Sequence, residues 1–248
     1  MLDVVTLGET QVRFSPKGYL RLDQAHEMEV NAAGAESNVA VALARLGMRT
    51  GWISKLPDHP LSRLIVGEIR RHGVDTSRVV WTTEGRVATY FFERAVPPRP
   101  PRVWYDRKGS AVTTLRLPSV SILFCGRADA EQVFGLAGEP EAVARAFREK
   151  FGIPTVVLTL GAQGSLALAD RVHRQQRVHR VEMVDPLGAG DAFAAGFLCG
   201  YLEDGVQRGL DLGGSTAALD CTIVGDAAFI TRAEVEELLT SEDQEIQR

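Results

Sequence analysis

The sequence predicts an α/β protein with a doubly wound, mostly parallel sheet and a small antiparallel flap. Apolar, strand-like runs alternate with amphipathic helical stretches along most of the 248 residues, and this alternation favours a parallel sheet covered on both faces. Residues 86–105 hold two strand-like runs with no helix between them, which predicts the flap. The length suits one large α/β domain or two small ones.

The first half of the chain opens with a strand and continues with two helices. The apolar run Leu2–Leu7 predicts a short buried strand. Apolar side chains recur on one face of Glu36–Leu46, and Gly47 follows as a stop signal. Leu61–Arg71 repeats this helical pattern before another glycine.

The flap is predicted from two extended segments and the turn between them. Arg86–Arg94 is rich in β-branched and aromatic residues, and Val103–Tyr105 continues in the same style. Four prolines in Pro97–Pro101 cannot pair within a central strand, so that segment should be an exposed turn.

The second half alternates strands and helices. A strand is expected at Ile122–Phe124, a polar-faced helix at Glu139–Phe151 and a strand at Thr155–Leu160. A glycine-bounded turn follows at Gly161–Gly164, and the last expected helix is Arg232–Thr240.

The segment Asp185–Asp191, DPLGAGD, carries the clearest chemical signal. It follows the predicted strand Val178–Val184 and precedes the predicted buried helix Ala192–Leu198. Its glycines let the backbone pass close to a ligand, and the N–H groups at a helix start attract anions. Asp191 in the first turn would lie within reach of a hydroxyl. This arrangement suits phosphoryl transfer to an alcohol.

Composition removes several other classes. The net charge of −4 gives no electrostatic footprint for nucleic acid or an anionic membrane. Cys125, Cys199 and Cys221 are too few and too widely spaced for a disulfide framework or a zinc site. With no signal-peptide pattern or membrane-length apolar run, a cytoplasmic location is expected. No G-x-G-x-x-G follows the first strand, which argues against a dinucleotide oxidoreductase.

Three motifs together resemble those of the ribokinase-like (PfkB-type) carbohydrate kinases. They are residues 33–40 (AGAESNVA), residues 159–164 (TLGAQG) and residues 185–191. The resemblance covers nearly the whole chain. It implies one ribokinase-like domain over residues 1–248, with a β-sheet lid drawn from about residues 10–32 and 86–108. It also implies ATP-dependent phosphorylation of a sugar hydroxyl, with Mg²⁺ as cofactor and a monovalent cation as a further candidate.

The resemblance assigns roles residue by residue. Asp191 would be the general base, and the backbone of Gly188, Ala189 and Gly190 would form the anion hole. The residues expected to contact the sugar are Gly34, Ala35, Asn38, Tyr90, Tyr105, Asp106, Arg107, Asp191 and Asp226. Those expected along the nucleotide, besides the Gly188–Asp191 turn, are Thr159, Leu160, Gly161, Ala162, Gln163 and Gly164.

The lid favours an acid sugar as substrate. Keto-acid kinases of the family carry a tyrosine and an arginine in this region, and Arg107 could hold a carboxylate through its planar fork. The expected substrate is therefore 2-keto-3-deoxygluconate or a similar acid sugar. Lid sheets of the family often pair between subunits, so a homo-oligomer is expected, with no nucleic-acid or membrane partner.

Three departures from the family pattern stand out. Pro186 and Leu187 replace two threonines, and residues 126–129 keep only Asp129 as a weak metal candidate. About two strand–helix units, on the order of 60 residues at ~30 per unit, are absent near Arg116 and Leu117. A shortened relic that binds sugar or nucleotide without phosphoryl transfer is therefore the alternative function. The turn at residues 161–164 could also be a plain hairpin, and Tyr105 and Arg107 an exposed flap.

Overall fold

The computed structural model describes residues 1–114, 121–175, 178–225 and 227–240. The chain forms two compact units. Unit 1 comprises residues 1–44 and 49–116, and unit 2 comprises residues 45–48 and 117–248.

Two short parallel strand pairs and two helices form the core of unit 1. Trp52 is fully buried and packs with Ile65 and Ile69 of the second helix. The bounds of these elements are β1 Val4–Leu7, α1 Ala35–Arg45, β4 Thr50–Ile53, β5 Lys55–Pro57, α2 Pro60–Arg71 and β6 Val80–Thr82, with β1 paired to β4 and β5 to β6. Both predicted helices are confirmed to within one residue at each end. The predicted strand is confirmed from Val4 onward, but its predicted burial is wrong, since no residue of β1 is buried and Val5 is 46% exposed.

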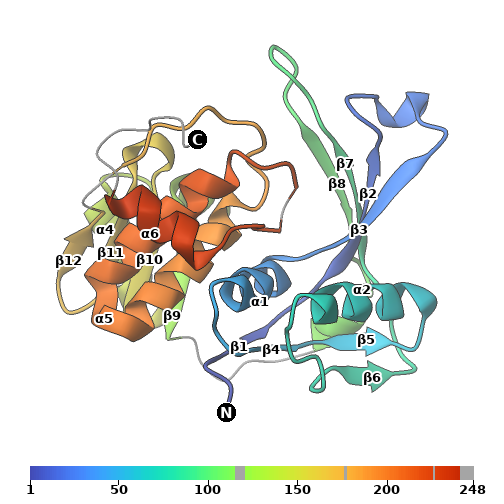
Figure 1. The fold of residues 1–248 in the computed structure, drawn as a ribbon, viewed down its shortest axis with the longest axis horizontal. Helices are drawn as coiled ribbons and strands as arrows, with labels where there is room; N and C mark the ends of the chain where they lie inside the picture. Colours follow the sequence, from blue (N-terminus) through green and yellow to red (C-terminus); the bar gives the residue numbers. More distant parts are fainter. Residues whose placement is uncertain (115–120, 176–177, 226, 241–248) are drawn as a thin grey trace. The chain divides into compact units, whose positions relative to one another are not determined.

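A four-stranded sheet, here called the lid, forms the rest of unit 1 (Figure 1). The predicted hairpin is confirmed, because β7 and β8 pair antiparallel with Tyr90 opposite Tyr105. The strands run in the order β3-β2-β7-β8, and their bounds are β2 Gln11–Pro16, β3 Met28–Ala33, β7 Thr89–Glu93 and β8 Arg102–Asp106. The turns η1 Leu22–Gln24 and η2 Ala111–Thr114 complete the unit.

Local signals explain where the helices of unit 1 begin. His59 caps α2, since its ring nitrogen accepts a hydrogen bond from the Leu61 N–H, and Pro60 fills the first helical position. Within α1, Ser37 donates from Oγ to the Gly34 carbonyl at 2.9 Å. Residues 37–43 of α1 are all buried, so the helix is fixed mainly by packing.

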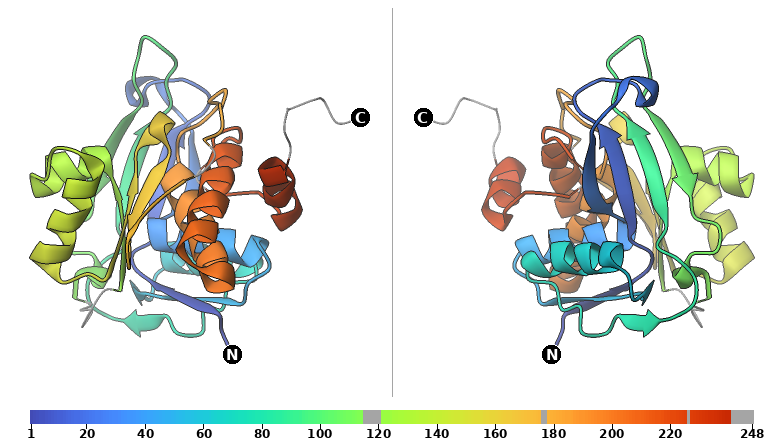
Figure 2. Two further views of the ribbon diagram at one scale, coloured as in Figure 1. Left: turned by 90° about the vertical axis from the view of Figure 1, so that its left-hand side faces the viewer. Right: turned by 90° about the vertical axis from the view of Figure 1, so that its right-hand side faces the viewer.

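Unit 2 is a mixed sheet with helices on both faces, as Figure 2 shows. Val156 and Leu158 pack with α4, whereas Val157 between them packs with α5, as strand alternation requires. The strand order is β12-β11-β10-β9, and the bounds are β9 Ile122–Gly126, α3 Arg127–Phe134, α4 Pro140–Phe151, β10 Thr155–Thr159, η3 Gly161–Gln163, β11 Ser165–Leu168, β12 Val172–Arg174, α5 Ala189–Asp220 and α6 Arg232–Thr240. β9 and β10 are parallel, and the other pairs are antiparallel.

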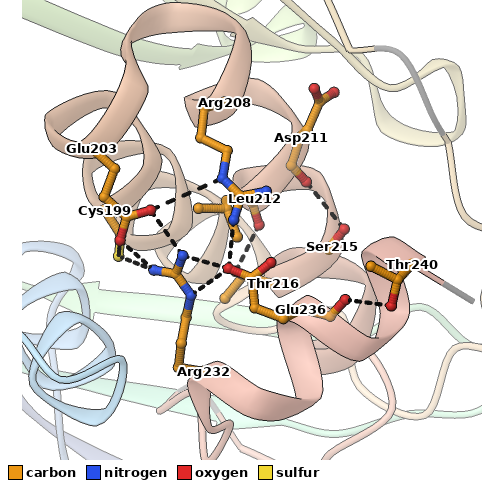
Figure 3. Close-up of polar contacts among 10 residues, drawn as sticks. All are labelled: Cys199, Glu203, Arg208, Asp211, Leu212, Ser215, Thr216, Arg232, Glu236 and Thr240. Atoms are coloured by element: carbon orange, nitrogen blue, oxygen red, sulfur yellow. Dashed lines mark hydrogen bonds and ion pairs between the residues drawn. The ribbon is translucent and has the colours of Figure 1, made fainter.

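A cluster of charges ties α6 to α5 (Figure 3). Arg232 donates to both oxygens of Glu203 at 2.6 and 2.8 Å and also binds Glu236, which in turn accepts from Arg208. The pKa of Glu203 is lowered by its hydrogen bond with Arg232. Residues 204 and 205 interrupt α5, and Gly205 has a φ of +78° that only glycine adopts readily. We call Glu203, Arg208, Arg232 and Glu236 the α5–α6 clamp.

One predicted element is wrong. Val178–Val184 forms no strand, although Val184 at its end donates its N–H to the Cys221 carbonyl at 2.8 Å. Val178, Met183 and Val184 are exposed, so apolar content misled the prediction. None of the helices in the described ranges is long and apolar enough to cross a membrane.

Candidate active site

A buried carboxylate fixes the turn that leads into α5. Asp185 is 6% exposed. Its two oxygens accept hydrogen bonds from the Leu187 N–H at 3.0 Å and the Gly225 N–H at 3.1 Å. Gly188 then adopts a left-handed conformation, with a φ of +87°. The chain therefore enters the helix in a conformation that a residue with a Cβ would strain.

The first turn of α5 brings the expected catalytic residues together. Ala189 and Gly190 begin the helix, and Asp191 follows in its first turn, half-buried. The first bond of the helix runs from the Ala192 N–H to the Gly188 carbonyl at 2.8 Å. A Cβ built on Gly190 would meet no atom within 4 Å. The open space above a positive helix end suits a phosphate group.

The expected nucleotide turn connects two antiparallel strands. Leu160 donates its N–H to the Gly164 carbonyl at 2.8 Å, which closes the turn between β10 and β11. Residues 161–163 are exposed, and Arg127 reaches the Gln163 side chain at 3.5 Å. The segment is a hairpin turn in form, and its expected nucleotide contact stays a prediction.

Strand register places the metal candidate next to this turn. Gly126 at the end of β9 pairs with Thr159 at the end of β10. A Cβ on Gly126 would lie 3.1 Å from Asp129 Oδ2 and 3.8 Å from Thr159 Oγ1. Within the described ranges no group of three or more His, Cys, Asp or Glu side chains could hold a metal. The metal role of Asp129 stays a prediction, and it would require the mode in which Mg²⁺ binds substrate phosphates together with one carboxylate.

In unit 1, the start of α1 packs directly on the loop that follows β1. A Cβ on Gly34 would lie 2.3 Å from the Glu9 carbonyl oxygen, so no side chain fits there. The Asn38 N–H donates to the Gly34 carbonyl at 2.8 Å, whereas Ala35 is exposed. The three residues expected in the sugar pocket therefore share one helix start.

Of the expected lid residues, Tyr90, Tyr105 and Arg107 share one side of the sheet, and Asp106 lies on the other side. The Tyr90 and Tyr105 rings lie 5.5 Å apart, with Tyr90 buried and Tyr105 65% exposed. Arg107 donates from Nε to Glu9 at 2.7 Å. Asp106 points to the other side of β8 and forms an ion pair with Arg86. Asp226 lies outside the described residues.

Two carboxylates near Arg107 escaped the sequence prediction. Glu9 forms an ion pair with Arg107. Burial raises the pKa of Glu36, while the positive charge of Arg107 acts in the opposite direction and lowers it. The carboxyl of Glu36 takes the space that a Cβ on Gly8 would need. The signal for Glu9 was its position just past the carboxyl end of a strand, where ligand sites of α/β sheets gather.

Comparison with known proteins identifies the family. The model of the pfkB family of carbohydrate kinases matches residues 1–99 and 100–232. The chain belongs to this family. It is 32% identical to the 2-dehydro-3-deoxygalactonokinase of Haloferax volcanii, over 99% of both chains, and 29% identical to the 2-dehydro-3-deoxygluconokinase of Bacillus subtilis, over 86% of the chain and 88% of that relative.

The fold of this carbohydrate kinase is ribokinase-like, as predicted. The crystal structure of the Thermotoga maritima 2-dehydro-3-deoxygluconokinase superposes with a TM-score of 0.83 at 24% identity, over 96% of the chain and 98% of that structure. The alignment with the Haloferax relative spans 316 positions, against 248 residues here. That difference agrees with the shortening expected from the motif spacing.

Proposed function

We propose that this carbohydrate kinase transfers the γ-phosphoryl group of ATP to a hydroxyl of a 2-keto-3-deoxy sugar acid, such as 2-keto-3-deoxygluconate or its galactonate epimer. The observation that carries the proposal is the turn before α5, where Asp191 stands beside Gly188 and the open face of Gly190. The names of the Haloferax and Bacillus relatives support the substrate class.

The turn supplies a base and an anion site for that reaction. Asp191 would take the proton from the attacking hydroxyl. The N–H groups at the start of α5 would stabilise the negative charge that develops on the transferred group. ATP with Mg²⁺ supplies the phosphoryl group and neutralises phosphate charge when bound. A monovalent cation stays a prediction.

The lid supplies a cation for the acid group. Arg107 is 55% exposed and is fixed by one ion pair, so its guanidinium can hold a carboxylate in a bidentate manner. The paired rings of Tyr90 and Tyr105 present an apolar wall with two hydroxyls on the same face of the sheet. A neutral sugar would offer no carboxylate to the Nη1 and Nη2 end of the Arg107 guanidinium, which the pair with Glu9 through Nε does not use.

The opposite face of the lid would contact a second copy of the chain. Val30, Phe14, Phe91 and Trp104 stand in register across the four strands. Three of these side chains, Val30, Phe91 and Trp104, are between 36% and 42% exposed. Such an apolar row on a soluble protein suits an interface. Trp104→Glu should lower the apparent mass in sedimentation at equal concentration, and an unchanged mass would contradict this contact.

A panel of sugars tests the substrate and the activity together. ADP release by the 248-residue chain should require 2-keto-3-deoxygluconate or 2-keto-3-deoxygalactonate and should be weak with fructose and ribose. Equal rates with neutral and acid sugars would overturn the substrate assignment. Heat stability raised by ATP and an acid sugar, without ADP release, would instead indicate a binding protein.

A further inference from the structure

Glu9 is a buried carboxylate whose partner is a much more exposed arginine. The Glu9 side chain is 8% exposed and that of Arg107 is 55% exposed, with 2.7 Å between Oε2 and Nε. A charged carboxylate is costly to bury unless it is paired. Glu9 therefore gains from keeping the Arg107 guanidinium in one place.

The atoms that Glu9 uses leave the rest of the guanidinium available. Arginine carries five N–H donors, and Glu9 takes the one on Nε. Within the described ranges, no hydrogen bond is formed by Nη1 or Nη2 of Arg107. These two nitrogens form the end of the fork that binds a carboxylate with two parallel hydrogen bonds. Glu9 and a substrate carboxylate would thus bind different hydrogens of Arg107.

Glu9 also joins the two parts of the expected sugar pocket in unit 1. Its carbonyl lies against Gly34 at the start of α1, and its side chain reaches Arg107 just past β8. The position of the guanidinium relative to the helix start is therefore set by one residue.

We propose that Glu9 is a positioning residue that holds Arg107 by Nε so that Nη1 and Nη2 grip the carboxylate of an acid substrate. The inference rests on the proposed acid-sugar substrate. It assigns acid-sugar selectivity to a residue pair rather than to Arg107 alone.

Three substitutions at Glu9 separate positioning from charge. Glu9→Gln keeps an oxygen that accepts from Nε, Glu9→Asp withdraws it by one methylene, and Glu9→Ala removes it. We expect the dissociation constant for 2-keto-3-deoxygluconate, measured by calorimetry without ATP, to rise about 10- to 100-fold in the Asp and Ala variants. The Gln variant should stay within about threefold of the wild type. KM for the acid should follow while kcat changes little.

Three further variants, Arg107→Ala, its combination with Glu9→Ala and Glu29→Ala, exclude a purely structural effect. Arg107→Ala should weaken acid binding as much as Glu9→Ala, and the double variant should be no weaker than either one, because both act through one contact. Glu29→Ala removes another ion pair of the same sheet, Glu29 with Arg94 at 2.9 Å, and should leave acid binding unchanged. If Glu9→Ala does not fold, Glu9→Asp carries the comparison.

The outcomes separate this inference from the kinase assignment. Tighter acid binding in both Glu9→Gln and Glu9→Ala would show that Glu9 competes with the substrate, which overturns the inference. Additive losses in the double variant would overturn it too. A chain that binds the acid but releases no ADP would contradict the proposed activity, while the binding series would still decide the role of Glu9.

Discussion

The starts of α1 in unit 1 and of α5 in unit 2 each hold expected ligand-binding residues, and they use glycine for different reasons. At α1, Gly34 is required because the Glu9 backbone fills the space where a Cβ would be, 2.3 Å away. At α5, Gly188 is required by its left-handed φ of +87°, whereas Gly190 faces open space. The first start is closed by the protein itself, and the second is left open.

This difference separates packing from ligand binding. A glycine whose Cβ position is occupied by backbone atoms, such as Gly34, is required by the packing of the fold, because any larger residue would push the two segments apart. Gly190 has no atom within 4 Å of its Cβ position and no left-handed φ, so its surroundings leave room for a ligand. The contrast supports the turn before α5 as the place where phosphate binds.

The largest effect should come from the base at the open helix start. Asp191→Asn keeps the size of the side chain but cannot take a proton, so kcat with an acid sugar should fall about 10²- to 10⁴-fold. Stopped-time ADP assays measure this. The melting temperature, followed by circular dichroism, should stay close to that of the wild type. Sugar-dependent turnover that survives the substitution would remove Asp191 from the role of base.

The same methyl group should act in opposite ways at the two helix starts. Gly34→Ala should lower the free energy of unfolding by about 1–3 kcal/mol, because backbone must move. Gly190→Ala should keep or raise the free energy of unfolding, by up to about 1 kcal/mol, since alanine favours helix. Its kcat/KM should nevertheless fall about 100-fold, because a misplaced phosphate reacts poorly.

Urea unfolding and ADP release on both variants test this pair. Each variant serves as the other's control, since the added atoms are identical. Full activity in Gly190→Ala would show that the phosphate does not approach this turn. Unchanged stability in Gly34→Ala would show that the loop after β1 gives way easily, and the comparison between the two starts would fail.

Where the sequence predicted a helix, the structure has one, because the signals are local; α3 and the part of α5 after Leu198 were not predicted. Arg232–Thr240 is confirmed at both ends, and the other predicted helices begin and end within one residue of the observed bounds or lie within them. α1, α2 and α4 have apolar stripes with glycine or proline at their ends, and neither feature depends on distant residues. The Val178–Val184 segment failed since apolar content alone cannot tell a strand from an exposed loop.

The sequence predicted which candidate-site residues lie together only where those residues are adjacent in sequence. Gly188, Ala189, Gly190 and Asp191 are neighbours in sequence, and the structure places them on one turn. The contact between Glu9 and Arg107 joins residues 98 positions apart. Such a contact depends on the order of the lid strands, which no local pattern specifies. The motifs of the sequence therefore indicated Arg107 but not Glu9, which accepts the hydrogen bond from its Nε.

A smaller effect is expected from the α5–α6 clamp, which anchors the helix of the open start. Arg232→Ala removes the partner shared by Glu203 and Glu236, so the free energy of unfolding should fall by about 1–2 kcal/mol at neutral pH. Arg174→Ala breaks the single exposed pair with Glu141 and should cost at most about 1 kcal/mol.

The clamp should also depend on pH. The hydrogen bond with Arg232 holds the pKa of Glu203 below its usual 4.5. The pKa of Glu236 is also lowered, because the burial that would raise it is outweighed by its hydrogen bonds with Arg208 and Arg232. A lowered pKa means that the stabilisation is present above pH 4.5 and is lost as the pH falls further. The difference between wild type and Arg232→Ala should therefore shrink below pH 4.5. A difference that stays constant down to pH 3 would show that packing, not charge, holds α6.

The smallest effect on stability should come from the ion pair between Asp3 and Arg49, which lies at the beginning of β1, ahead of the start of α1. Asp3 accepts hydrogen bonds from the Arg49 side chain and from the Arg49 N–H at 2.9 Å, and these bonds lower the pKa of Asp3 from 3.8 to about 2. The pair fixes the beginning of β1 beside β4, and β1 leads into Glu9. Its contribution is present above pH 3.8 and is lost as the pH falls through about 2. Asp3→Asn should thus flatten the melting temperature between pH 4 and pH 2 relative to wild type, and parallel curves would show that β1 needs no charge to keep its register.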